Sequence, residues 1–299
     1  MLTEHFHNTQ KYTGHYSNDL RYVLSHQNTT AAFEEIKTWK GYSQTPLHSL
    51  DSLASEIGIK NIYYKDESSR FGLGSFKALG GTYGVLKFIQ HALKKEIGDE
   101  VSMKDIHAGN YSEQISKYTV TTATDGNHGR SVAFGAKLFG CKCQIYIHSE
   151  VSSGRQKAME DLEATVTRVS GNYDESLQIC IEDAGKNNWH VISDTSYEGY
   201  TKYPRYIMAG YNVMAEEIIA QIKDRALPTH IFLQGGVGSF PGAICGYFWE
   251  KFPGNNIKFV VVESEHAPCL IRSAQNNQMT SVNIKQETMM AGLSCGEPS

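Results

Sequence analysis

The chain has 299 residues, of which 40% are hydrophobic and 20% are charged, and its formal net charge is −4. This composition is typical of a globular protein, and the absence of any basic run predicts no nucleic-acid partner. Because no signal-peptide core and no apolar window of about 20 residues are found, we expect a cytoplasmic enzyme with no membrane partner.

The first forty residues are polar and rich in His, Asn and Tyr, which predicts a surface arm. After them, Phe76, Leu79, Tyr83 and Leu86 recur at helical spacing, and Ser75 is a suitable N-cap, so we expect a helix that begins at Ser75.

Lys77 then falls in the first turn of that helix, where a cation faces the positive end of the helix dipole. The functional interpretation is that dipole and burial depress the pKa of Lys77, which leaves an amine able to form a Schiff base with a carbonyl cofactor. The alternative is an ordinary surface lysine.

From residue 60 onward, short apolar runs rich in β-branched residues alternate with helical segments, in the order NIYY, TVTTAT, CQIYIH, TVTRVS, WHVISD, THIFLQ and KFVVVES. This alternation predicts βαβ units, and therefore an α/β protein with mostly parallel sheets flanked by helices. The length favours two lobes, with residues 1–92 and 189–299 in a large lobe and 93–188 in a small one.

In parallel sheets, ligands collect beyond the carboxyl ends of the strands. The first such loop contains Thr124, Asp125, Gly126, Asn127 and His128, before a helix expected from residue 130 to 139. Asn127 and Gly126 are also explained by helix capping, whereas Asp125 and His128 bring titratable groups to the ligand side.

The second loop begins with Asp194, an aspartate that either caps the next turn or acts as a base. The third loop is glycine-rich and precedes an apolar helix, so its backbone N–H groups are suited to a phosphate. It contains Gly235, Gly236, Val237, Gly238 and Ser239.

Nucleotide sites fit this third loop less well. No Lys-Ser or Lys-Thr follows the glycines, which argues against a nucleoside triphosphate. Gly236, Gly238 and a strand-end acid, Glu263, approach the dinucleotide fingerprint, but Pro241 stands at the third glycine position. A lysine, an amide loop and a phosphate cradle together favour pyridoxal phosphate.

The sequence resembles the fold-type II pyridoxal-phosphate enzymes, and within them the diaminopropionate ammonia-lyases. The resemblance rests on SFKALGG around Lys77, TATDGNHGR around Asp125 and Asn127, ISDTSYEGY around Asp194, QGGVGS around Gly236, and MAGLSCGEP near the end. It implies a two-lobed fold, a homodimer, and the conversion of D- and L-2,3-diaminopropionate to pyruvate and ammonia.

The resemblance also implies residue roles. Lys77 would form the Schiff base, Asn127 would lie near the ring hydroxyl, and residues 235 to 239 would surround the phosphate. Lys77 and Asp125 would act as bases on opposite faces of Cα, with Asp194 assisting at the substrate amine. Thr124, Gly126 and His128 would line the substrate side.

Two alternatives stay open: a serine or threonine dehydratase or β-replacement enzyme of the same superfamily, and a non-catalytic ligand-binding relative. The related dehydratases have a small hydroxyl residue where this chain has Asp125, which favours the ammonia-lyase. The family usually carries a later strand whose Ser or Thr meets the pyridine nitrogen, so we expect this sequence to be truncated after residue 299.

The cysteines are scattered at positions 141, 143, 180, 245, 269 and 295. This spacing matches neither a disulfide framework nor a zinc-ligand set, so no metal is predicted. Cys269 and Cys295 could meet in space.

Overall fold

The computed structural model describes residues 4–12, 14–124, 126–223, 226–284, 288 and 290–299. Its strands are β1 (Leu47–Ser49), β2 (Tyr63–Lys65), β3 (Thr119–Ala123), β4 (Lys142–Ile147), β5 (Thr165–Arg168), β6 (His190–Val191), β7 (His230–Gln234) and β8 (Lys258–Val262). Its α-helices are α1 (Asn18–Val23), α2 (His26–Ile36), α3 (Asp51–Glu56), α4 (Lys77–Ile97), α5 (Met103–His107), α6 (Ser112–Ile115), α7 (Asn127–Phe139), α8 (Ser153–Glu160), α9 (Tyr173–Asn187), α10 (Lys202–Tyr211), α11 (Val213–Ile222), α12 (Ser239–Lys251) and α13 (Cys269–Asn276). Two short 3-10 helices, η1 (Arg70–Gly72) and η2 (Ala291–Leu293), complete the elements.

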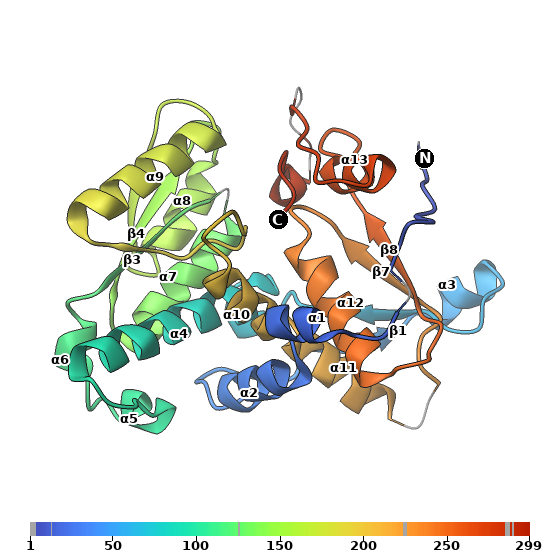
Figure 1. Ribbon diagram of the computed structural model, residues 1–299, viewed down its shortest axis with the longest axis horizontal. Helices are drawn as coiled ribbons and strands as arrows, with labels where there is room; N and C mark the ends of the chain where they lie inside the picture. The colour runs from blue at the N-terminus through green and yellow to red at the C-terminus, as the bar shows by residue number, and fades with distance from the viewer. Residues whose placement is uncertain (1–3, 13, 125, 224–225, 285–287, 289) are drawn as a thin grey trace.

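The largest sheet has four parallel strands in the order β5-β4-β3-β6 and lies in the green and yellow half of Figure 1. Successive residues of a strand point to opposite faces, and the two faces of this sheet have different partners. Ile145 packs in one core cluster with residues of α7, whereas Tyr146 packs in another with Cys180 of α9. Helices on both faces explain why β3 and β4 are apolar along most of their length.

A second parallel pair, β7 and β8, lies in the other half of the molecule beside α12 (Figure 1). Leu233, Ile244 and Phe248 form its own small core. The predicted strand NIYY is present as β2, but it pairs antiparallel with β1 and joins no parallel sheet. The βαβ prediction is therefore wrong for this run, because β2 forms an antiparallel pair with the preceding strand.

The prediction of a surface arm for the first forty residues is wrong from Ser17 onward. Ser17 and Ser25 cap α1 and α2 with their side chains. Ala32, Ile36 and Trp39 are almost fully buried in the main core. Ala32 and Ile36 lie one turn apart on the same face of α2, and Trp39 follows in the turn after the helix, so three apolar residues dock an otherwise polar segment.

Helix α4 runs from the middle of the molecule toward α6 (Figure 1) and packs against both α7 and α10. Glycines allow these close approaches. A Cβ on Gly81 would lie 1.9 Å from the Ser131 hydroxyl of α7, and one on Gly210 of α10 would lie 2.6 Å from the Leu79 carbonyl oxygen. The start of α4 is thereby held between elements from both halves.

Among the described residues, no helix is both long enough and apolar enough to cross a membrane.

Candidate active site

Lys77 is the first residue of α4, so the helix begins two residues later than predicted. The residue preceding the helix is Phe76, which makes no side-chain cap. The hydroxyl of Ser75 still accepts a hydrogen bond from the Lys77 N–H at 3.2 Å. Further upstream, Phe71 has a φ of 49° within η1.

The side chain of Lys77 donates a hydrogen bond from Nζ to the carboxylate of Asp194 and forms an ion pair with it. These side chains are 23% and 16% exposed, so water screens the pair only weakly. Burial lowers the pKa of Lys77, but the charge of Asp194 outweighs this effect, and the net shift of the pKa is upward. The predicted depression of this pKa is therefore wrong, because the counterion comes from a loop far along the chain.

Asp194 shows the matching shift. Burial raises the pKa of its carboxyl, but the neighbouring His128 and Lys77 outweigh burial and move the pKa well below its usual range. The two groups are thus held as a carboxylate and an ammonium at the end of β6 and the start of α4.

His128 lies beside this pair, with its Nδ1 atom 3.7 Å from an oxygen of Asp194. Its Nε2 atom is 2.7 Å from the carbonyl oxygen of Ile192, which can only accept, so Nε2 carries the proton. Burial lowers the pKa of His128 more than Asp194 raises it. A neutral ring therefore presents the lone pair of Nδ1 toward the ion pair.

The loop before His128 is organised by Thr124. Its buried hydroxyl accepts hydrogen bonds from the N–H groups of Gly126 and Gly129, each at 3.0 Å. Helix α7 begins at Asn127, three residues before the predicted start, and Gly126 occupies the N-cap position. Thr124 therefore performs the capping that the sequence suggested for Asn127, while the predicted base Asp125 lies outside the described residues.

The glycine-rich loop lies next to Asp194. Ser239, the first residue of α12, donates its hydroxyl proton to the Asp194 carbonyl oxygen at 2.8 Å. Gly238 precedes the helix with a φ of 105°, a conformation that favours glycine. A Cβ on Gly235 would meet side chains of β8 and α13 at 2.7 and 2.9 Å. These glycines are required by both conformation and space.

Glu263, the acid that suggested a dinucleotide site, has a structural role instead. Its two carboxylate oxygens accept hydrogen bonds from the N–H groups of Leu270 and Ile271 in the first turn of α13, at 2.8 and 2.7 Å. With both oxygens engaged at this helix start, the geometry argues against a ribose-binding acid. Cys269 nearby donates to the Gly236 carbonyl at 3.4 Å.

An aromatic wall beside Lys77 was missed by sequence reasoning. The rings of Tyr211 and Phe76 lie 5.8 and 6.0 Å from Lys77 Nζ. The ring of Phe240 in turn lies 4.5 Å from that of Phe76. Phe240 directly follows the glycine loop, which is a signal that could have been used, whereas Tyr211 lies in α10 without any motif around it.

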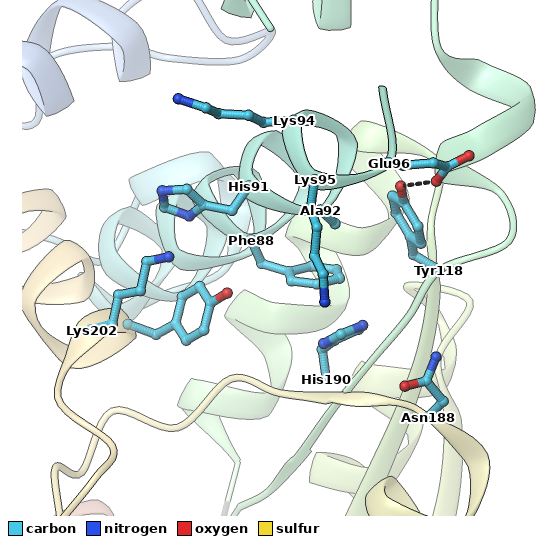
Figure 2. Close-up of a pocket in the computed structure, with 11 residues that line it drawn as sticks. Phe88, His91, Ala92, Lys94, Lys95, Glu96, Tyr118, Asn188, His190 and Lys202 are labelled. Atoms are coloured by element: carbon cyan, nitrogen blue, oxygen red, sulfur yellow. Dashed lines mark hydrogen bonds between the residues drawn. The ribbon is translucent and has the colours of Figure 1, made fainter. Parts of the chain in front are cut away.

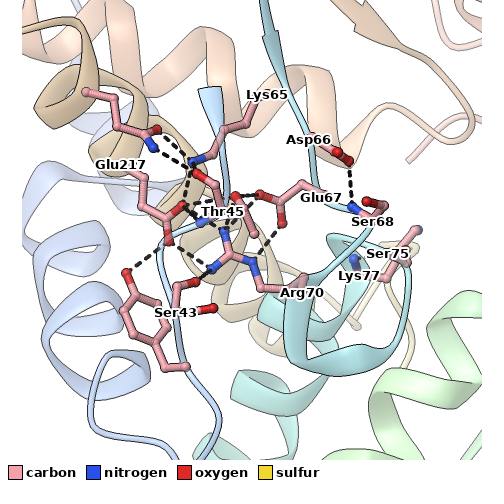
Figure 3. Close-up of polar contacts among 12 residues, drawn as sticks. Ser43, Thr45, Lys65, Asp66, Glu67, Ser68, Arg70, Ser75, Lys77 and Glu217 are labelled. Atoms are coloured by element: carbon pink, nitrogen blue, oxygen red, sulfur yellow. Dashed lines mark hydrogen bonds and ion pairs between the residues drawn. The ribbon is translucent and has the colours of Figure 1, made fainter. Parts of the chain in front are cut away.

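The turn that leads into Lys77 is anchored by a buried polar network, which Figure 3 shows. The guanidinium of Arg70 donates to both carboxylate oxygens of Glu217 at 2.8 Å. It also donates to Glu67 at 2.8 Å, and Lys65 Nζ donates to Glu217 at 2.6 Å. Glu217 and Arg70 are almost fully buried. The network ties β2 and η1 to α11.

The geometry brings three sequence motifs together. Lys77, Asp194 and His128 form a contiguous cluster, and Ser239 brings the glycine loop to the same place. A primary amine beside a carboxylate, an aromatic wall and a helix start that favours anions together suit a cofactor with an aldehyde, a ring and a phosphate.

Comparison with known proteins agrees with this geometry. The family model described as "Pyridoxal-phosphate dependent enzyme" matches residues 38–299. The chain is 38% identical to diaminopropionate ammonia-lyase of Escherichia coli K12 over 260 residues, covering 87% of this chain and 64% of the relative. It is 39% identical to the same-named protein of Salmonella typhimurium over 267 residues, covering 88% of this chain and 66% of that one.

The chain thus spans somewhat less than two thirds of the length of these relatives. A crystal structure of the Escherichia coli diaminopropionate ammonia-lyase, in complex with an aminoacrylate-PLP azomethine reaction intermediate, superposes with a TM-score of 0.82 at 35% identity. That match covers 92% of this chain and 68% of the other. The chain therefore belongs to the pyridoxal-phosphate dependent enzymes, has the fold-type II architecture, and has pyridoxal phosphate as its cofactor.

Proposed function

We propose that this protein converts 2,3-diaminopropionate, in both its D and L forms, to pyruvate and ammonia by α,β-elimination. The observation that carries the proposal is the cluster of Lys77, Asp194 and His128 beside the glycine loop. The names of the similar proteins from Escherichia coli and Salmonella typhimurium support the choice of substrate.

The residues present fit the cofactor. At the start of α12, the first N–H groups have no partner within the helix, and the dipole of this 13-residue helix favours an anion there. Gly235 to Ser239 would hold the phosphate, Asn127 would lie near the ring hydroxyl, and Lys77 Nζ would bind the aldehyde carbon. Bound pyridoxal phosphate supplies a ring that accepts the electrons left on Cα when its proton is removed.

Lys77 would move protons at two atoms of the substrate. In its neutral form, Nζ would take the Cα proton on its own face, and the Asp194 carboxylate would stabilise the ammonium that results. A protonated Nζ beside the substrate could then donate to the β-amino group as this group leaves. We assign removal of the Cα proton on the opposite face to Asp125, which would admit both enantiomers.

Asp194 and His128 would orient the reacting groups. The Asp194 carboxylate would bind an ammonium group of the substrate, because it is buried and ionised beside Lys77. His128 would accept a hydrogen bond at Nδ1 from an ammonium group of the substrate, since its Nε2–H is already engaged by the Ile192 carbonyl. Thr124 and Gly126 would shape the substrate side through the capping of α7.

Substrate comparison tests the proposal. We expect the holoenzyme to release pyruvate from both enantiomers of diaminopropionate at much higher kcat/KM than from D- or L-serine, and Lys77→Ala to abolish this activity. A large preference for serine would favour the dehydratase alternative. A colourless protein that takes up no cofactor would favour a non-catalytic relative.

We also infer two lobes, with residues 1–92 and 189–299 in the large one and 93–188 in the small one, and a homodimer located in the cytoplasm. The dimer is tested by analytical ultracentrifugation of the holoenzyme, in which a mass of one chain at micromolar concentration would contradict it. Fractionation of the producing cells tests the location.

A further inference from the structure

A cavity lies away from the Lys77 cluster, at the other end of α4. Its volume is about 760 Å³. Lys77 begins α4, whereas the cavity contacts this helix between Phe88 and Glu96, about 16 to 28 Å further along its axis. Its lining also includes Tyr118, Asn188, His190, Lys202 and Tyr203.

The lining carries an excess of positive charge, although the whole chain is negative. Lys94, Lys95 and Lys202 line the cavity, against one carboxylate, Glu96. That carboxylate accepts a hydrogen bond from the Tyr118 hydroxyl at 2.6 Å. Lys94 is paired with Glu100. Within the described part of the chain, neither Lys95 nor Lys202 has a carboxylate partner, so two cations lack a counterion.

The histidines of the cavity respond to these cations. Burial lowers the pKa of His91 to about 4, assisted by the charges of Lys202, Lys87 and Lys94. Burial and then Lys95 lower the pKa of His190. The Nε2 atom of His91 is 3.4 Å from the Tyr206 hydroxyl, and its Nδ1 atom is buried. The His91 ring therefore senses the positive charge of the cavity without being exposed to it.

The floor of the cavity is aromatic. The ring of Phe88 is buried and lies 4.1 Å from the ring of His190, inclined by 33°. Figure 2 shows Lys95, Lys202, His91 and His190 arranged around Phe88. Lys95 and Lys202 are exposed, so their ammonium groups are accessible to an anion that enters the cavity from solvent. The positive groups are therefore presented from α4 and α10 on a preformed surface.

We propose that this cavity is a binding site for a small polyvalent anion of the phosphate class, held by Lys95 and Lys202, with the nearby His91 ring as a reporter of the bound charge. The site is distinct from the glycine loop and does not depend on the proposed reaction. Lys95 near the end of α4 and Lys202 at the start of α10 would bind the anion from two sides.

Titration of the holoenzyme with inorganic pyrophosphate tests this proposal. The bound cofactor fills the glycine loop, so that loop cannot supply the signal. At constant ionic strength, calorimetry should show saturable binding to one site per chain. The NMR signal of the His91 ring should move with the same saturation, and the pKa of His91 should rise because an anion offsets the nearby lysines.

Variants localise the site. Lys95→Gln and Lys202→Gln should each weaken pyrophosphate binding about tenfold, the loss of one charge-assisted hydrogen bond. The matched control is Lys186→Gln, a lysine of α9 outside the cavity that pairs with Glu182, and it should leave binding unchanged. Circular dichroism verifies that each variant is folded.

Three results would overturn the proposal: no saturable binding to the wild-type holoenzyme, equal weakening by the control variant, or binding that leaves the His91 signal unmoved.

Discussion

At the scale of single residues, the position of Lys77 is explained by its partner. A cation in the first turn of a helix is opposed by the helix dipole. Asp194, brought in from the end of β6, supplies the missing negative charge. Both members of the pair favour their charged forms, because the pKa of the lysine shifts upward and that of the aspartate shifts downward.

Removal of this charge should be measurable in the cofactor-free protein. Asp194→Asn should lower the free energy of unfolding by about 2 kcal/mol at pH 7, the value of a partly buried hydrogen bond to a charged group. Because the Asp194 pKa is depressed on folding, its contribution is present above the unfolded value of about 3.9 and is lost as the pH falls further.

The contribution of Lys77 to stability depends on pH in the opposite direction. Its pKa is raised on folding, so this contribution is complete below the unfolded value of about 10.4 and is lost as the pH rises through the folded value.

Urea unfolding should give a constant difference in the free energy of unfolding between wild type and Asp194→Asn from about pH 5 to pH 9. The control Asp161→Asn, from an exposed pair with Lys157, should change stability by less than about 0.5 kcal/mol. A difference that disappears already at pH 5 would contradict the assignment.

At the scale of elements, the buried network around Glu217 holds the turn before Lys77. Burial raises the pKa of Glu217, but Arg70 and Lys65 outweigh burial and keep the carboxylate ionised. Glu217→Gln would leave Arg70 buried with one acceptor fewer. We therefore expect the free energy of unfolding, measured in urea, to fall by about 3 kcal/mol.

The matched control for this variant is Glu113→Gln, from an exposed pair with Lys117. This control should lower the free energy of unfolding by less than about 1 kcal/mol, because water solvates both partners. Equal losses in the two variants would show that burial of the Glu217 network has no special importance.

The contact between α4 and α10 depends on glycine at position 210. In Gly210→Ala, the new Cβ would lie 2.6 Å from the Leu79 carbonyl oxygen and 2.9 Å from Gly80 Cα, both backbone atoms. We expect the free energy of unfolding, measured by thermal unfolding, to fall by about 1 to 3 kcal/mol, since the two helices must move apart.

Gly185→Ala is the comparison for that variant. This position in α9 has no atom within 4 Å of the added Cβ. It should stabilise the protein by about 0.5 to 1 kcal/mol, because alanine favours the helix. Destabilisation by Gly185→Ala of the same size would mean that helix packing is not the cause at Gly210.

At the scale of the whole molecule, cofactor binding should stabilise the fold. A ligand that binds only the folded state adds about 2.7 kcal/mol at a hundred times its Kd. We expect removal of pyridoxal phosphate to lower Tm and its return to raise Tm with concentration. Pyridoxal, which lacks the phosphate, should raise Tm less, because the start of α12 would have no anion to bind. Equal shifts with the two compounds would contradict a phosphate site there.

Much of the architecture was predictable because strands and glycine loops are encoded locally. The runs from TVTTAT to KFVVVES are strands β3 to β8, and a positive φ at Gly238 follows from its turn. The amino-terminal region was predicted wrongly, since its few buried residues, such as Ile36 and Trp39, are hidden among polar neighbours. Short polar helices acquire their stability from docking, which local pattern does not report.

The sequence by itself determined the α/β class, the family motifs and the position of Lys77 at a helix start, because these depend on residues close together in the chain. Only the tertiary structure decided the charge state of Lys77, the tautomer of His128 and the structural role of Glu263. Each of these depends on atoms from distant segments, and electrostatic and hydrogen-bond energies are set by distances in space and by burial.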